Sequence, residues 1–461
     1  MPNVSKNEIY EIYITGMTHE AQGVGRIDGF TVFVDGVLPD ETAEVRIIKV
    51  TKSYAVGKLL NIKKHSPKRV EPFCSSYKRC GGCSLQHLSY DGQLSFKKNQ
   101  VSDALKRIGK IEGAIIHDII GMNDTMRYRN KAQFPVGMEG EKPVIGFYAS
   151  RSHDIIVNES CGIQHAASDA AKEIVHEFMV KSNVSGYDEA TGKGLVRHVV
   201  TRKAFATGEV MVVVVINGDR LPGSEELVKM LDEGVQGLES VYININKDKT
   251  NVILGRKSVL IHGKKTIVDN IGSFKFEISP ASFFQVNSVQ TEVLYGKALS
   301  YAGLTGKETV FDLYCGIGTI SLFLSQKAAF VYGVESVADA VEDAKRNAKL
   351  NGVENVEFIE GEAEKVVSGI LERGVKADVV VVDPPRKGCD EKLLETLVKM
   401  QPERIVYVSC NPSTLARDLG YLTGNGFRVL EVQPVDMFPY TAHVESIVLM
   451  TKCGLEDEKQ R

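Results

Sequence analysis

Long hydrophobic runs are absent from this sequence of 461 residues. No stretch of about 18 consecutive apolar residues occurs, which argues against a membrane-spanning helix. Residues 1–10 are polar and lack the apolar core of a signal peptide. A content of 43% hydrophobic and 25% charged residues is that of an ordinary globular protein. We therefore expect a cytoplasmic protein that does not enter a membrane.

A strong net charge is also absent, because 56 Lys and Arg against 59 Asp and Glu leave a formal charge of -3. The chain as a whole lacks the basic excess that is typical of nucleic-acid-binding proteins. The charge is unevenly distributed, however, since residues 45–70 contain eight Lys or Arg and no Asp or Glu. This basic run predicts a surface that follows a phosphate backbone, and the alternative is a solvated face of an ordinary domain.

Internal repeats and low-complexity linkers are absent too, so domains must be recognised from changes in pattern. Residues 1–65 contain short strand-like segments, with a turn at Gly23-Val24-Gly25, and predict a small β-barrel of the oligonucleotide-binding type. Residues 66–270 mix strands and helices, which predicts an α+β domain. Residues 271–461 settle into alternating strands and helices, which predicts a Rossmann-like α/β domain. The amphipathic segment 87–109 predicts a helix that is available to pack on this last domain.

Cysteine is scarce, and its eight residues are unevenly placed. Disulfides are not expected in a reducing compartment. Cys74, Cys80 and Cys83 form a C-x5-C-x2-C pattern in which thiolates could bind one metal centre, with the distant Cys161 as the fourth ligand. Four thiolates suit either Zn²⁺ or an iron–sulfur cluster, and the spacing does not choose between them. The five-residue gap differs from the C-x3-C-x2-C pattern of radical enzymes, so we interpret the centre as closed and structural; unligated thiols are the alternative.

A dense mixture of cations, an amide and an aromatic ring follows at residues 126–131, Met-Arg-Tyr-Arg-Asn-Lys. Such a mixture can hold a nucleic-acid backbone while Tyr128 stacks on a base. The same alternation also fits a plain exposed strand.

The last third contains a nucleotide-binding pattern. The predicted strand at 310–314 is followed by Gly316 and Gly318, which allow a ligand close to the start of a helix. Ser321 stands where the dinucleotide fingerprint has its third glycine, which argues against NAD. The next predicted strand leads to Glu335, an acid suited to the two hydroxyls of a ribose. This combination resembles class I S-adenosylmethionine-dependent methyltransferases.

Three chemically reactive residues lie at the ends of later predicted strands. Asp383 follows an apolar strand and precedes two prolines, and Cys410 follows another strand and precedes Asn411-Pro412. We expect Ser413 to cap the helix after Cys410. Glu445 begins the final strand. Because ligands bind beyond the carboxyl ends of strands in open α/β sheets, these residues are predicted to converge at one edge, with Cys410 either a nucleophile or a buried, inert thiol.

As a set, these stretches closely resemble the RNA (uracil-5-)-methyltransferase family. The matches are S-P-x-S-F-F-Q-V-N at 279–287, F-D-L-Y-C-G-I-G at 311–318, D-P-P-R-K-G at 383–388, S-C-N-P-x-T-L-A-R-D at 409–418 and H-V-E at 443–445. The front half resembles the 23S ribosomal RNA branch, with an N-terminal TRAM domain and the C-x5-C-x2-C…C pattern of a [4Fe-4S] cluster.

The resemblance implies that Cys410 is the nucleophile and Glu445 the proton acceptor. It also implies that Gln285, Tyr314, Glu335 and Asp383, together with Gly316 and Gly318, bind S-adenosylmethionine, and that Cys74, Cys80, Cys83 and Cys161 hold the cluster. Phe283, Phe284 and Phe438 are candidates for stacking on an extruded uridine, or else core residues.

The expected substrate is thus 23S ribosomal RNA, methylated at C5 of a uridine through a covalent adduct by a monomer that acts on neither DNA nor membranes. Three alternatives are methylation of transfer RNA, a DNA cytosine-5-methyltransferase and a non-catalytic RNA-binding iron–sulfur protein. The DNA enzymes place a proline before the cysteine, where this chain has Ser409.

Overall fold

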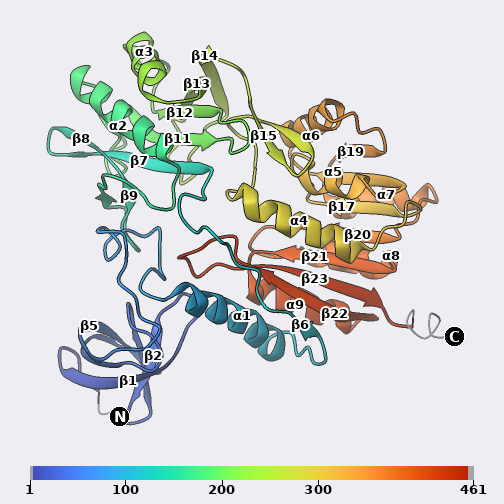
Figure 1. Cartoon of the computed structure of the whole chain (residues 1–461), viewed down its shortest axis with the longest axis horizontal. Coiled ribbons are helices and arrows are strands. Elements are labelled where there is room, and N and C mark those ends of the chain that lie inside the picture. Colours follow the sequence, from blue (N-terminus) through green and yellow to red (C-terminus); the bar gives the residue numbers. More distant parts are fainter. Residues whose placement is uncertain (1–3, 455–461) are drawn as a thin grey trace. The chain divides into compact units, whose positions relative to one another are not determined.

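The computed structural model describes residues 4–454, which form two compact units (Figure 1). The first comprises residues up to Gln100 together with Phe438–His443, and the second comprises Val101–Met437 together with the chain from Val444 onward. The boundary falls inside helix α1 (Tyr90–Arg107). None of the helices in residues 4–454 is both long and apolar enough to cross a membrane.

A closed five-stranded barrel forms the first part of the first unit, as the sequence predicted. Its strands, in the order β1-β2-β3-β5-β4, are β1 (Ile9–Met17), β2 (Gly23–Ile27), β3 (Phe30–Val34), β5 (Tyr54–Lys64) and β4 (Thr42–Val50). Alternate apolar residues such as Ile12, Ile14 and Val32 fill the interior. Most cations of the basic run, on β4, β5 and the segment that follows, face solvent.

Strand β2 corrects the turn predicted at Gly23-Val24-Gly25, which is an extended part of the barrel. The glycines are there because the barrel wall is tight. A Cβ atom on Gly23 would collide with Val37, and one on Gly25 would collide with Ile12. Glycine in a strand therefore marks a close approach here rather than a change of direction.

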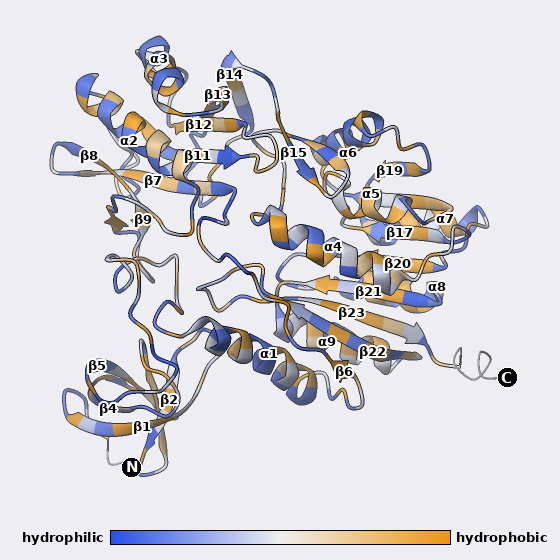
Figure 2. Ribbon diagram, in the orientation of Figure 1, coloured by the Kyte–Doolittle hydropathy of each residue, from blue (hydrophilic) through white to orange (hydrophobic). Residues whose placement is uncertain are grey.

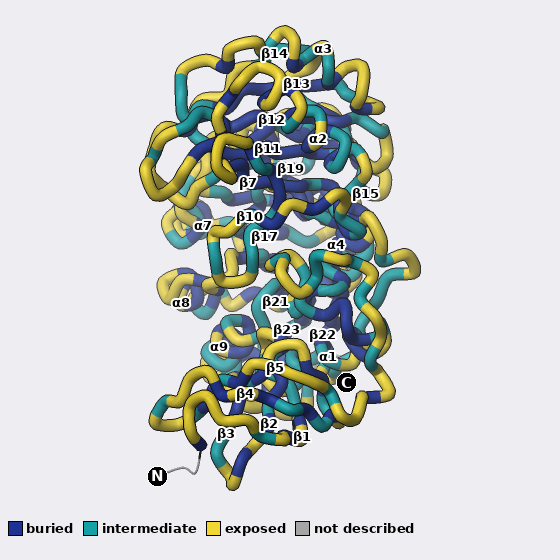
Figure 3. Tube along the Cα trace, turned by 90° about the vertical axis from the view of Figure 1, so that its left-hand side faces the viewer, coloured by how far each residue is buried: buried dark blue, intermediate teal, exposed yellow. Residues whose placement is uncertain are grey.

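The second unit contains a six-stranded sheet in its first part, in the order β14-β13-β12-β11-β7-β8. Its strands are β7 (Lys131–Glu139), β8 (Lys142–Ile145), β11 (Val196–Lys203), β12 (Val210–Ile216), β13 (Leu238–Ile245) and β14 (Lys257–Gly263). Helices α2 (Ala166–Lys181) and α3 (Ser224–Gly234) cover one face and share its apolar core. The central strands of this sheet are among the most deeply buried segments (Figure 3).

Two short hairpins complete this region. Strands β9 (Phe147–Tyr148) and β10 (Ile155–Ile156) pair with each other, as do β15 (Ile267–Ile271) and β16 (Phe274–Ile278). Residues 126–130 are a loop leading into β7, which begins at Lys131, and Tyr128 is only 3% exposed. The expected stacking of a base on Tyr128 is therefore wrong, because its ring is inside the protein.

An eight-stranded sheet carries the predicted site, in the order β19-β18-β17-β20-β21-β23-β22-β6. Its strands are β6 (Ile115–Ile116), β17 (Thr309–Leu313), β18 (Phe330–Glu335), β19 (Val356–Glu360), β20 (Val379–Val382), β21 (Arg404–Ser409), β22 (Phe427–Val435) and β23 (Glu445–Lys452). Strands β17 to β21 are mutually parallel, whereas β23 runs antiparallel to both of its neighbours.

Helices cover both faces of this sheet, which is why its central strands are apolar without alternation (Figure 2). The helices are α4 (Ser288–Ala302), α5 (Thr319–Ser325), α6 (Ala338–Leu350), α7 (Ala363–Glu372), α8 (Glu391–Met400) and α9 (Pro412–Thr423). One core cluster joins α7, α8, α9 and the end of α1, through Val101 and Leu105, to one face of the sheet.

Helix α9 begins two residues earlier than predicted. Asn411 rather than Ser413 is its N-cap, and the Asn411 side chain accepts a hydrogen bond from the Ser413 backbone N–H. Pro412 occupies the first helical position, where its missing N–H costs nothing. The nucleophile candidate Cys410 thus immediately precedes the cap.

Candidate functional site

The carboxyl-terminal edge of the eight-stranded sheet brings together Asp383, Cys410 and Glu445. Strand β20 ends one residue before Asp383, β21 ends one residue before Cys410, and β23 starts at Glu445. The register pairs Val382 with Tyr407 and Ser409 with Ser446, so the three predicted site residues lie at the same edge of neighbouring strands. This is the predicted convergence.

Like charges and burial dominate the electrostatics of this edge. Burial, followed by the charge of Asp383, raises the pKa of the almost completely buried Glu445. Burial and then Asp312 raise the pKa of Asp383. Burial, with Glu445 and Asp383 as further causes, raises the pKa of the Cys410 thiol to about 11, and Arg386 opposes the shift. Burial and like charge therefore both favour the protonated forms of Glu445, Asp383 and Cys410.

Arg386 is a residue whose place in the site the sequence reasoning missed. It is an exposed cation that lowers the pKa values of both Cys410 and Glu445. Its position in D-P-P-R-K-G, directly after a strand end, is a signal that could have indicated this role.

The glycine-containing turn after β17 has a constrained backbone. Tyr314 has a positive φ of 69°, which is unusual for a residue with a side chain, and Gly316 and Gly318 have φ of 56° and 82°. A Cβ on Gly316 would meet no atom within 4 Å, whereas one on Gly318 would lie 2.8 Å from the Phe358 ring. Gly316 therefore borders open space, where a ligand can approach the backbone, and Gly318 allows the turn to pack closely.

Glu335 lies at the end of β18, beside this turn. Its Oε2 accepts a hydrogen bond from the Gly316 N–H at 3.2 Å, and its Oε1 accepts one from the Val337 N–H at 2.9 Å. The Ser336 hydroxyl also donates to Oε1 at 3.2 Å. Glu335 is therefore fixed in orientation, and its Oε2 keeps a lone pair for a ribose hydroxyl.

The loop before α4 places Gln285, which is 7% exposed. Asn130 donates from its side chain to the Gln285 carbonyl at 2.8 Å and to the Ser288 hydroxyl at 3.0 Å. Arg202 donates to the carbonyls of Pro280 at 3.1 Å and Ser282 at 2.5 Å. Asn130 and Arg202 therefore hold the loop before α4 in place.

The aromatic candidates separate by exposure. Phe283 is 69% exposed, whereas Phe284 is 4% exposed and packs against Phe276. Phe284 is a core residue, and Phe283 remains available for stacking. Phe438 belongs to the other compact unit.

The cysteines of the predicted cluster are half-buried, and none of the eight cysteines forms a disulfide. Cys74, Cys80 and Cys83 share one loop of the first unit, and Cys161 belongs to the second. The Gly82 N–H donates to the Cys80 sulfur at 3.4 Å, an interaction of the kind found around cluster thiolates. Within residues 4–454, no three His, Cys, Asp or Glu side chains are arranged to hold a metal ion. Four thiols are the donors that such a cluster needs, but the described residues do not show them gathered around one point.

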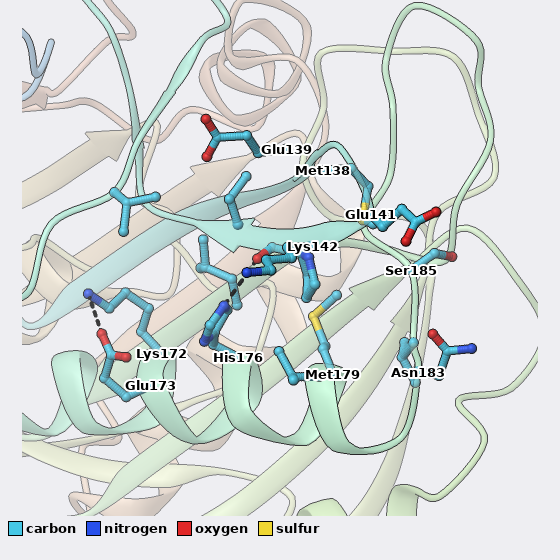
Figure 4. Close-up of a pocket in the computed structure, with 16 residues that line it drawn as sticks. Met138, Glu139, Glu141, Lys142, Lys172, Glu173, His176, Met179, Asn183 and Ser185 are labelled. Carbon is cyan, nitrogen blue, oxygen red and sulfur yellow. Dashed lines mark hydrogen bonds and ion pairs between the residues drawn. The ribbon is translucent and has the colours of Figure 1, made fainter.

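A separate cavity of about 850 Å³ lies between the β7–β8 hairpin and α2 (Figure 4). Its lining includes Met138, His176 and Met179, and none of the predicted site residues. It therefore belongs to the six-stranded sheet and not to the site described above.

Comparisons with known proteins indicate the family of the chain. A family model described as tRNA (Uracil-5-)-methyltransferase matches residues 89–453, and a TRAM domain model matches residues 4–60. An uncharacterized RNA methyltransferase of Clostridium tetani is 56% identical over 98% of each chain. Another from Caldanaerobacter subterraneus subsp. tengcongensis is 55% identical over 98% of this chain and 100% of its own.

A solved structure is similar over nearly the whole chain. It is the Pyrococcus abyssi tRNA (uracil-54, C5)-methyltransferase in complex with S-adenosyl-L-homocysteine, 30% identical with a TM-score of 0.76, and the match covers 96% of this chain and 100% of that one. The fold and the glycine turn define a class I, S-adenosylmethionine-dependent RNA methyltransferase. Within that class, the chain belongs to the tRNA (uracil-5-)-methyltransferase family and carries an N-terminal TRAM domain.

The buried Asp312 gives the site a measurable pH signature. Burial, with Glu335 as a smaller cause and the Ser321 hydroxyl opposing, raises the pKa of Asp312 to about 7. Between pH 4 and this value the unfolded chain binds fewer protons than the folded one, so this residue makes folding less favourable as pH rises. We expect Asp312→Asn to raise the thermal midpoint relative to wild type by more at pH 8 than at pH 5, through a free-energy difference on the order of 1–3 kcal/mol.

Thermal denaturation of both proteins at the two pH values measures this difference. Asp103→Asn, on the exposed surface of α1, controls for removal of a carboxylate. An equal effect of Asp312→Asn at both pH values would contradict the buried-acid interpretation.

Proposed function

We propose that this protein transfers a methyl group from S-adenosylmethionine to C5 of a uridine in 23S ribosomal RNA, forming 5-methyluridine. The observation that carries the proposal is the convergence of Cys410, Asp383 and Glu445 at one sheet edge. Gln285, Tyr314, Glu335 and Asp383, with the backbone at Gly316 and Gly318, would hold the methyl donor. When bound, S-adenosylmethionine supplies an electrophilic methyl group on a sulfonium sulfur whose positive charge favours ionised carboxylates nearby.

The reaction needs a nucleophile because C5 of uracil is not reactive enough alone. After the Cys410 thiol has lost its proton to solvent, the thiolate sulfur adds to C6, and the electron pair of the 5,6 double bond makes C5 a nucleophilic enolate carbon. After C5 has taken the methyl group, Glu445 accepts the C5 proton. The double bond then re-forms and the C6–S bond breaks, which returns Cys410 as a thiolate. The target uridine must leave its stack to reach the thiol, at a cost of a few kcal/mol, and the exposed Phe283 is the candidate for stacking on it.

The choice of ribosomal RNA rests on the front half of the chain. The TRAM barrel carries exposed cations on β4 and β5, and the following loop carries the cluster cysteines. Transfer RNA is the second candidate, because the Pyrococcus abyssi structure is that of an enzyme named for transfer RNA.

A methyl-transfer assay separates these substrates. We expect radiolabel from S-adenosylmethionine to enter 23S ribosomal RNA from a strain lacking the gene, as 5-methyluridine. Cys410→Ala should abolish transfer while S-adenosylhomocysteine still binds, and Cys453→Ser, at an exposed cysteine, is the matched control. Label in transfer RNA alone would overturn the ribosomal assignment, and normal turnover by Cys410→Ala would overturn the nucleophile.

The role of Glu445 predicts a trapped intermediate. Glu445→Gln removes the proton acceptor but keeps the size of the side chain, so methylation should proceed and the C6–S bond should persist. A band of covalent protein–RNA complex should then appear on a denaturing gel. The double variant Glu445→Gln/Cys410→Ala is the control that must lose the band. A Glu445→Gln protein that turns over normally without an adduct would contradict the assignment.

We also propose that Cys74, Cys80, Cys83 and Cys161 hold a [4Fe-4S] cluster with a structural role. Protein purified without oxygen should be brown and contain iron and sulfide. Cys80→Ser should lose the colour, whereas Cys453→Ser should keep it. Colourless wild-type protein with stoichiometric zinc would reject the cluster in favour of a zinc site.

A further inference from the structure

A buried carboxylate joins the two loops that carry Asp383 and Cys410. Asp418 lies on α9 and is fully buried. Its Oδ2 accepts hydrogen bonds from the Cys389 backbone N–H at 2.8 Å and from the Tyr407 hydroxyl at 2.6 Å. Its Oδ1 accepts bonds from Arg417, through Nε at 2.8 Å and a terminal nitrogen at 2.7 Å. One side chain therefore connects the loop after β20, strand β21 and helix α9.

The partners of Asp418 lie close in sequence to the reacting groups. Tyr407 precedes Cys410 by three residues on β21 and pairs in register with Val382, the neighbour of Asp383. Cys389 closes the loop that begins at Asp383. The hydrogen bonds of Asp418 therefore link the end of the Asp383 loop, at Cys389, to the strand that leads to Cys410, at Tyr407.

Further bonds from the start of α9 hold the same loop by its carbonyl groups. The Thr414 hydroxyl donates to the Arg386 carbonyl at 3.1 Å, and the Asn411 side chain donates to it at 3.0 Å. Arg417 donates to the carbonyl of Lys387 at 3.0 Å. Asn411 is also the N-cap of α9 and directly follows Cys410. The same residue therefore holds the Asp383 loop and lies next to the proposed nucleophile.

The packing around Asp418 leaves no space for adjustment. Gly388 has a φ of 81°, and a Cβ there would lie 2.6 Å from both Asp418 Oδ2 and a terminal nitrogen of Arg417. A buried carboxylate is costly unless its lone pairs are used, and here donors from three elements use them. The loop at Gly388 is therefore packed directly against Asp418 and Arg417.

We propose that Asp418 is a positioning residue that sets the placement of Asp383 and Arg386 relative to the Cys410 thiol. The proposal rests on the function proposed above, because it assigns Asp418 a positioning role in RNA methylation without contact to the RNA or to S-adenosylmethionine. An error of about 1 Å in such a constellation can cost about 100-fold in rate.

Asp418→Asn tests this directly. The amide presents one oxygen where the carboxylate presents two, so it cannot accept from Cys389, Tyr407 and Arg417 together. We expect kcat for RNA methylation to fall about 10- to 100-fold. We expect the affinity for S-adenosylhomocysteine to fall by less than kcat, because Asp383 is only one of the residues proposed to hold the methyl donor.

A second measurement does not depend on turnover. The rate of Cys410 alkylation by iodoacetamide is followed against pH by mass spectrometry of its peptide. Since Asp383 and Arg386 act on the thiol, Asp418→Asn should shift the pH at which alkylation is half-maximal. Tyr407→Phe, which removes one donor and no charge, should show a smaller shift, and the double variant should go no further than Asp418→Asn. Asp103→Asn, an Asp in an exposed ion pair with Arg107, is the matched control.

The outcomes are distinguishable. Unchanged kcat and alkylation in a folded Asp418→Asn protein would overturn the inference, as would losses that merely follow a lowered thermal midpoint. If wild-type protein fails to methylate RNA but the alkylation profile still shifts, the proposed function fails and the positioning role stands. If wild-type protein methylates RNA and Asp418→Asn matches it in both measurements, only the positioning role fails.

Discussion

The reversed direction of β23 is the constraint on which the site depends. Strands β20 and β21 are parallel, so Asp383 and Cys410 follow them at the same edge. A further parallel strand would reach that edge with its last residue. Strand β23 runs antiparallel between β21 and β22, and therefore reaches it with its first residue, Glu445. Because β23 is reversed, Glu445, which follows a loop and begins a strand, lies at the same edge as Asp383 and Cys410, which follow strands and begin loops.

The carboxyl-terminal edge of the sheet brings several acidic side chains together with few positive charges to offset them. Burial raises the pKa values of Asp312, Asp383 and Glu445, and Arg386 is a cation that acts against the shift at Glu445. A cluster of this kind lowers the stability of the fold at neutral pH, since ionising buried carboxylates near one another is unfavourable. Functional sites tolerate such a cost where the chemistry needs a carboxyl group that loses its proton when a cation binds nearby and can then accept another.

The sequence predicts the sheet edge well because that part of the pattern is local. Each apolar strand ends at a recognisable residue, and the order of βα units leaves few possible topologies. The sequence is a poorer guide where one residue type occurs in two different structural settings. Gly23 and Gly25 look like a turn but form a tight strand, and Tyr128 looks like a stacking ring but is buried. Asp418 and Tyr407 give no local signal, because their partners lie in another loop.

The segment just before Glu445 is held by residues that a local pattern also could not reveal. The backbone N–H groups of Ser84 and Leu85, directly after Cys83, both donate to the Tyr440 carbonyl at 2.9 Å. Gln93 accepts from the Tyr440 N–H at 2.8 Å, and the fully buried Lys97 donates to the Phe438 carbonyl at 2.9 Å. The cysteine loop and α1 therefore fix residues 438–443 within the first unit. These hydrogen bonds of residues 438–443 are therefore made by residues more than 300 positions earlier in the chain, which no local sequence pattern can indicate.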